Sequence, residues 1–189
     1  MSELTAQLSN RFSDAYRHLV LADLRRELLR IEETKPSASD LAYLISTASR
    51  LALNADIDSP VAGAQCQLAY DIAVRAPRFA NGSRDIVMPL CEAILSRIGN
   101  FPARRLLVDA NMELKRVSDP FVDLESAVRE EENKFEDTPE GVTLTDFQVR
   151  LLKALRAKSS VSISAPTSAG KSYTLEHCCP VKTRTESVG

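Results

Sequence analysis

The residues with the most definite chemistry form an octet near the end of the chain, Ala165-Pro-Thr-Ser-Ala-Gly-Lys-Ser172. The octet fits the phosphate-binding loop G-x-x-x-x-G-K-[ST], except that Ala165 replaces the first glycine. In such a loop, backbone N–H groups surround a phosphate and the following helix directs its positive end at the same group. Gly170 would allow the close approach, Lys171 would reach the β- and γ-phosphates, and Ser172 would bind Mg²⁺ through its hydroxyl.

The segments on either side of the octet match the context that this loop requires. The run Val161–Ser164 has the β-branched residues of a short strand, and Tyr173–Glu176 is compatible with a helix. The alternative is a turn of small residues that ends in Lys-Ser by chance. The strand-like and helix-like flanks favour the nucleotide loop.

The octet resembles motif I of the superfamily 2 helicases, the DEAD/DEAH-like ATPases that unwind DNA and RNA, in which Ala is common at the first position and Pro-Thr often follows. Phe147-Gln148 lies 23 residues before Lys171 and resembles the Gln-containing element that precedes motif I in those families. The resemblance implies that Gln148 reads the adenine edge and that ATP and Mg²⁺ are cofactors; alone, Gln148 would be a polar residue on a helix face. The implied nucleotide-binding residues are Gln148, Ala165, Pro166, Thr167, Ser168, Ala169, Gly170, Lys171 and Ser172.

The resemblance covers only about residues 143–176, and much of the family's machinery does not follow it. Only 17 residues come after Ser172, and none of them form the Asp-Glu pair that holds Mg²⁺ in the family. Pro180 interrupts the last helix, and the tail is polar. We therefore expect the truncated N-terminal portion of a helicase with an atypical tail. Ordering the loop costs about 1–2 kcal/mol per residue, so weak or no ATP binding and no hydrolysis are expected.

Ahead of the motif, six amphipathic helices with short joints are expected in residues 1–128. The first helix is predicted at Leu4–Ile31 and the second from Ser39 or Asp40 to Asn54. The third begins after Ser59-Pro60 and the fourth after Asn81-Gly82-Ser83. The fifth runs from Phe101-Pro102 to Val117, and the sixth begins after Ser118-Asp119-Pro120. Pro89 is expected in the first turn of its helix or at a kink. Helical-hairpin repeats are an alternative to an irregular antiparallel bundle, which is favoured because no residue pattern recurs.

Composition supports a mainly α fold. The 189 residues are 44% hydrophobic and 5% aromatic with 6 Gly, a balance that favours helices. We expect an irregular antiparallel multi-helix domain in residues 1–128, an acidic linker in 129–142 whose first half continues the sixth helix, and the truncated start (helix, strand, P-loop) of an α/β RecA-like helicase domain in 143–189.

The net charge of −2 is unevenly distributed along the chain. Residues 143–189 carry 7 Lys+Arg against 3 Asp+Glu, which is the better electrostatic footprint for a nucleic-acid partner; the alternative is a short basic tail without a function. Two basic clusters lie earlier, Arg25-Arg26 with Arg30 and Arg104-Arg105 with Lys115-Arg116. Acidic residues share their helices, so solvated faces are favoured over nucleic-acid contacts.

The remaining candidates are weaker. His177-Cys178-Cys179 would be a poor zinc site because the ligands are adjacent and no second pair exists. His18 is expected to be an ordinary helix residue. The four cysteines lack paired spacing, and no signal peptide or membrane span is evident, so a cytoplasmic protein without membrane contact is expected.

Two functions follow from these observations. The first is the N-terminal portion of an ATP-dependent superfamily 2 DNA or RNA helicase or translocase, the chain itself lacking ATPase activity. The alternative is a helical module that binds a protein or a nucleic acid and carries an inert motor remnant.

Overall fold

A computed structural model describes residues 10–31, 35–55, 61–107, 120–135, 141–157, 162 and 171–178. Within these ranges the chain is mainly α-helical, as its composition predicts. The elements in chain order are α2 (Asn10–Leu24), η1 (Arg25–Leu29), α3 (Ala38–Leu53), α4 (Ala62–Arg75), η2 (Ala76–Phe79), α5 (Arg84–Arg97), η3 (Phe101–Leu106), α6 (Pro120–Glu132), β1 (Lys134–Phe135), β2 (Val142–Thr143), α7 (Asp146–Arg156) and α8 (Lys171–Cys178). None of the helices in these ranges combines the length and apolar character needed to cross a membrane.

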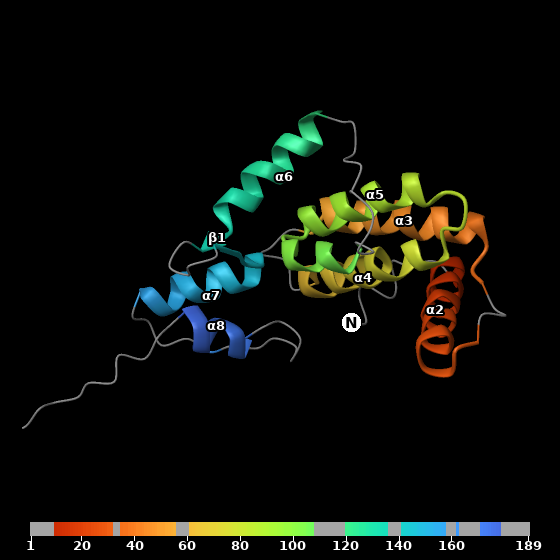
Figure 1. The fold of residues 1–189 in the computed structure, drawn as a ribbon, viewed down its shortest axis with the longest axis horizontal. Helices are drawn as coiled ribbons and strands as arrows, with labels where there is room; N and C mark the ends of the chain where they lie inside the picture. Colours follow the sequence, from red (N-terminus) through yellow and green to blue (C-terminus); the bar gives the residue numbers. More distant parts are fainter. Residues whose placement is uncertain are drawn as a thin grey trace, which may run out of the picture.

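Helices α2 to α5 share the larger hydrophobic core. α3, α4 and α5 lie alongside one another and α2 packs across their end (Figure 1). The largest side chains fully buried here are Leu19, Leu44, Ile72, Ile94 and Leu95. They recur at helical spacing on faces that meet, and each buried aliphatic side chain contributes about 1.5–3 kcal/mol.

The first helix ends two residues before Ile31, the limit that its apolar pattern predicts. The described part begins at Asn10, changes to a π-helix at Arg25 and ends at Leu29, while residues 1–9 lie outside the described residues. Arg30 closes it in the left-handed conformation, with φ of 56°. Leu28 and Leu29 are exposed. The pattern therefore runs beyond the face that the bundle buries.

The start of α3 corrects the expected cap. Ser37, rather than Ser39 or Asp40, is the N-cap, and its hydroxyl accepts a hydrogen bond from the Asp40 N–H at 3.0 Å. Ser39 and Asp40 already lie in the first helical turn. Asp40 is the third helical residue, whose N–H is one of the groups that an N-cap side chain satisfies.

Two proline positions refine the expected helix starts. Pro89 lies inside α5, beyond its first turn, and the alternative of a kink at Pro89 stays a prediction. Phe101-Pro102 opens a short 3₁₀-helix, η3, where an α-helix was expected, and the expected end at Val117 falls in residues 108–119, which lie outside the described residues. The tighter winding ends where the Leu107 N–H donates to the Arg104 carbonyl at 3.1 Å.

The acidic stretch after residue 128 is structured where it is described. α6 continues to Glu132, as expected, and then Lys134 and Phe135 pair antiparallel with Thr143 and Val142. This two-stranded sheet was not expected. Phe135, Leu144 and Leu152 form a second, smaller core with Val142 and Val149 packed against it.

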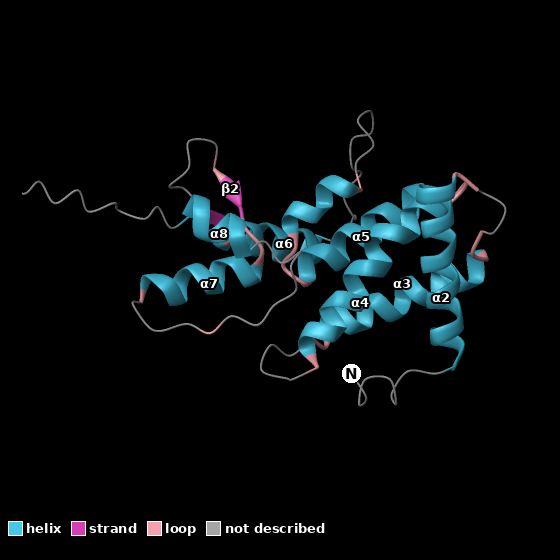
Figure 2. Ribbon diagram, turned by 90° about the horizontal axis from the view of Figure 1, so that it is seen from below, coloured by secondary structure: helices cyan, strands magenta, loops and turns pink. Residues whose placement is uncertain are grey.

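The second core lies to one side of the bundle. α7 and α8 pack together beyond the sheet, and α6 projects away from the bundle (Figure 1). Figure 2 shows the same separation from below, with β2, α7 and α8 at the end of the molecule opposite α2. The described part of residues 143–189, which were expected to begin the RecA-like domain, therefore lies at the end of the molecule away from α2.

Candidate functional site

Gln148 is fixed by the start of α7. Thr145 is the N-cap, and its hydroxyl accepts from the Gln148 N–H at 3.2 Å. The Gln148 side chain returns the contact, because its Oε1 accepts from the Thr145 N–H at 2.9 Å. This reciprocal pair is a capping box. Thr-x-x-Gln before an apolar helix is the sequence signal of this cap, and the motif resemblance of Gln148 does not reveal it.

The capping box leaves Gln148 buried, with 7% of its surface exposed. The side chain is also held in one position by the helix start. Gln148 can therefore present a fixed polar edge to a neighbouring cavity.

α8 begins at the last two residues of the octet. Lys171 is half-buried and Ser172 exposed, and Thr174 in the next turn is completely buried. Residues 165–170 lie outside the described residues, as does Val161–Ser164 except for Ser162, which is exposed and belongs to no strand. The expected strand and the loop therefore stay predictions.

Gln148 and α8 meet at a cavity of about 600 Å³, here called the α7–α8 cavity. Gln148 and Tyr173, the residue directly after the octet, both line it. The sheet contributes Val142 and Thr143 to an apolar wall. Its other side comes from η3 and α6 and carries the charged residues Arg104, Arg105 and Glu130. Of the expected nucleotide-site residues, Gln148 lines this cavity, whereas Lys171 and Ser172 are not among the residues that line it.

Arg104 is held between two carboxylates. It forms ion pairs with Glu92 of α5 and, at 2.7 Å, with Glu130 of α6. Burial acts to lower the pKa of Arg104, but the charges and hydrogen bonds of the two glutamates outweigh it and raise that pKa. Arg104 consequently joins the bundle to α6, while Arg105 is exposed at the cavity edge.

A second set of polar contacts fixes α7 against the bundle. The Asp146 N–H donates to the Gly99 carbonyl at 3.0 Å. Its carboxylate accepts from Arg129 at 2.5 Å and from Asn133 at 2.7 Å. Arg129 also donates to the Arg97 carbonyl. These contacts join residues that lie far apart in the sequence, and no local sequence pattern predicts them.

The other candidates offer no comparable site. The described residues contain no group of three or more His, Cys, Asp or Glu side chains placed to hold a metal. The side chains of His177, Cys178 and Cys179 lie outside the described residues, and Mg²⁺ binding by Ser172 stays a prediction.

The two described cysteines are not activated nucleophiles. Burial raises the pKa of Cys91 to about 12. The pKa of Cys66 is raised by burial first and then by the nearby Asp146 carboxylate. A raised pKa keeps both side chains as thiols at neutral pH, and only the thiolate is the reactive form.

No protein-family model, curated protein or solved structure matches this chain. The family resemblance therefore depends on the motif residues themselves.

Proposed function

We propose that this chain is the N-terminal portion of an ATP-dependent superfamily 2 helicase or translocase acting on DNA or RNA. In this proposal residues 143–189 begin a RecA-like motor domain and residues 1–128 form a helical accessory domain. The chain alone does not hydrolyse ATP, because the acidic pair that would hold Mg²⁺ and position water is absent from its sequence.

The observation that supports this proposal is the shared cavity of Gln148 and Tyr173. They are 25 residues apart in the sequence. If the octet were a turn that ends in Lys-Ser by chance, the helix that follows it would not be expected to lie beside Gln148, the glutamine that the family resemblance selects. A cavity of about 600 Å³ is also within the size range of small-molecule sites.

The described residues suit parts of a nucleotide. Gln148 presents a fixed amide for a base edge, and Tyr173 provides an aromatic neighbour. Lys171 and Ser172 stand at the N-terminal end of α8, where the helix dipole favours phosphate. Lys171 would hold the phosphates and Ser172 would hold Mg²⁺, which supplies charge neutralisation when bound.

The decisive experiment is to sequence the gene downstream of codon 176 and to assay the full protein that it encodes. We expect an Asp-Glu box and a second motor lobe, with ATPase activity stimulated by nucleic acid. Lys171→Ala should lower that activity about 100-fold, the usual effect of removing a preorganised charge stabiliser. Lys153→Ala, an exposed lysine on α7, is the matched control and should have little effect. A full protein without these motifs would contradict the proposal.

A second candidate function is a helical binding module, and one observation favours it. Phe121, Leu124 and Val128 of α6 are 83%, 63% and 50% exposed, respectively. Their spacing places them on one helical face, and exposed apolar surface commonly marks a protein interface. A downstream frame that encodes no motor would leave this function as the better description.

A further inference from the structure

An exposed apolar face on α2 and η1 lies outside the bundle core. Leu21, Leu24 and Leu28 are 39%, 43% and 74% exposed and follow one another at steps of three and four. The residues of α2 that enter the core, among them Phe12 and Leu19, occupy the opposite side of the helix. The described bundle thus covers one apolar side of this helix, and the three exposed leucines are here called the α2 face.

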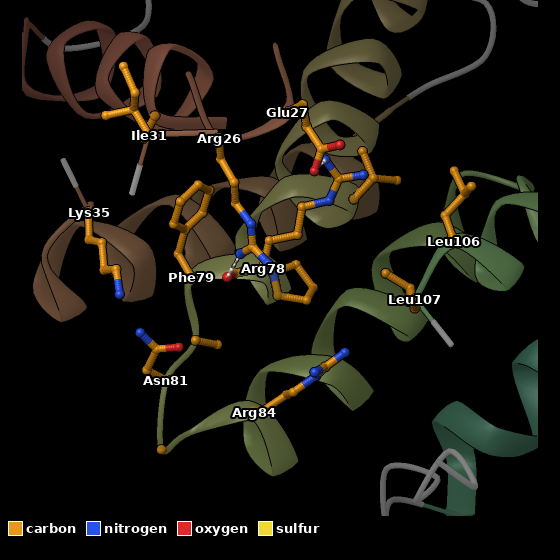
Figure 3. A pocket seen from close by; sticks show the side chains of 15 residues that line it. Arg26, Glu27, Ile31, Lys35, Arg78, Phe79, Asn81, Arg84, Leu106 and Leu107 are labelled. Carbon is orange, nitrogen blue, oxygen red and sulfur yellow. Dashed lines mark hydrogen bonds and ion pairs between the residues drawn. The ribbon is translucent and has the colours of Figure 1, made fainter. Parts of the chain in front are cut away.

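Contacts with η2 fix the end of the α2 face in place. The Arg26 guanidinium donates to the Arg78 carbonyl at 2.6 Å, and the Glu27 carboxylate lies 3.2 Å from the Arg78 guanidinium. Figure 3 shows Arg26 and Glu27 beside Arg78. Leu28 follows Glu27 directly, so an anchored turn holds it at the surface. A side chain that is already held in place loses less freedom when a partner covers it.

A second exposed apolar face, here called the α6 face, consists of Phe121, Leu124 and Val128 and has the same spacing. α6 projects from one side of the bundle, and α2 packs across its other end (Figure 1). The two faces of one chain therefore do not cover each other. The α2 face of one copy is nevertheless open to the α6 face of another copy.

Exposed carboxylates border the α6 face. Glu125 and Glu132 follow Phe121 and Val128 by four positions, which places them beside this face. Both glutamates are exposed, and neither forms an ion pair with another described residue. The α6 face therefore suits a partner helix that carries a cation next to its apolar residues.

The α2 face has such a cation at its N-terminal end. Arg17 precedes Leu21 by four positions, is exposed, and forms no ion pair with another described residue. Asp14 is the exposed carboxylate one turn before it, so the match depends on Arg17 itself. If α2 and α6 pack antiparallel, Arg17 lies at the end of α6 that carries Glu132, and each helix dipole meets the opposite end of the other.

We propose that the α2 face of one copy of this chain packs antiparallel against the α6 face of a second copy. Apolar residues at alternating steps of three and four form the line along which two helices pack. Two paired α6 faces would instead bring glutamates of both copies together, and like charges across an interface oppose association. The contact joins two different surfaces, so it is heterologous. The inference rests on the binding-module function, for which it names the partner, and does not involve the proposed motor.

The test is sedimentation velocity of the chain from about 10 μM to about 1 mM. The two faces are small, so we expect weak association, with monomers at the lowest concentration and larger species at the highest. Leu28→Glu and Leu124→Glu each bury a charge in the contact and should weaken association more than about tenfold. Leu53→Glu changes a residue of α3 that is 60% exposed, and as the matched control it should have less than about a twofold effect.

A mixture of the two variants distinguishes the heterologous contact from a symmetric one. Leu28→Glu keeps an intact α6 face and Leu124→Glu keeps an intact α2 face, so the mixture should form a heterodimer although neither variant associates alone. Arg17→Glu should weaken association about fivefold, and adding Glu132→Arg to the same chain should restore it. Loss of association in only one of the two leucine variants would indicate pairing of identical faces and would overturn the proposal.

Thermal unfolding separates loss of association from loss of folding. The changed side chains are exposed, so each variant should unfold at the temperature of the wild-type chain. Leu21→Glu replaces Leu28→Glu if the latter does not fold. A wild-type chain that stays monomeric at about 1 mM, or a mixture of the two variants that stays monomeric, would overturn the proposal. The binding-module function fails on a different result, a downstream reading frame that encodes a motor.

Discussion

Gly99 is the position where a single methyl group should test the junction between the bundle and α7. Gly99 has φ of +66°, a conformation that costs a residue with a Cβ about 1–2 kcal/mol. A Cβ built there would lie 1.9 Å from the Asp146 Cγ and 2.1 and 2.2 Å from its carboxylate oxygens. The Asp146 side chain would have to leave the position in which it accepts from Arg129 and Asn133.

The magnitude follows from these two costs. Loss of one hydrogen bond to a charged group costs about 1.5–3 kcal/mol, and the backbone strain adds to it. Gly99→Ala should therefore lower the free energy of unfolding by about 3–5 kcal/mol. Gly82→Ala is the matched control, because Gly82 has φ of +77° but no atom within 4 Å of the added Cβ. It should cost only the strain, about 1–2 kcal/mol.

The assay is urea unfolding followed by circular dichroism, with amide hydrogen exchange as a local readout. The Asp146 N–H, bonded to the Gly99 carbonyl, should lose protection in Gly99→Ala and keep it in Gly82→Ala. If Asp146 carries the steric cost, Asp146→Ala and Gly99→Ala together should cost less than the sum of the single changes. Equal destabilisation by Gly99→Ala and Gly82→Ala would refute the reasoning.

Two further predictions concern charge. Arg104→Met should lower the free energy of unfolding, measured by urea titration, by about 3 kcal/mol, because it leaves Glu92 buried without its cation. Arg105→Met changes an exposed site and is the control. It should change the free energy of unfolding by less than about 0.5 kcal/mol. Burial first, and then Asp71, raises the pKa of Tyr16 from 10.0 to about 12. The unfolded chain therefore loses this proton first, so stability should fall between these two pH values; Tyr16→Phe should flatten the decline, and an unchanged slope would count against the assignment.

The local patterns predicted much of the fold. Buried apolar residues at three- and four-residue spacing identified α3, α4 and α5, and Pro120 marked the start of α6. Such patterns depend on neighbours within one or two turns, which a sequence displays directly. Errors arose where distant packing decided the outcome. Leu28 continues the apolar pattern of α2, but none of the described elements covers it, and it is 74% exposed.

The candidate site was predicted only in part. The motif selected Gln148, Lys171 and Ser172 by their types and spacing, and of these three only Gln148 lines the α7–α8 cavity, together with Tyr173 of α8. Nucleotide binding by these residues stays a prediction. Arg104 was assigned to a solvated face because acidic residues share the helices of the basic clusters. Its partners in the structure, Glu92 and Glu130, lie 12 and 26 residues away. Its role at the cavity wall could not be read from neighbouring residues.

By itself, the sequence determined a mainly helical chain and a phosphate-loop pattern, because helix periodicity and motif spacing are local properties. Only the tertiary structure decided which charges meet. Arg26 and Arg84 share a cavity although 58 positions separate them, and Asp146 reaches Gly99 across 47. The physical reason is that charge interactions act through space over a few ångströms, and the packing of the helices sets those distances.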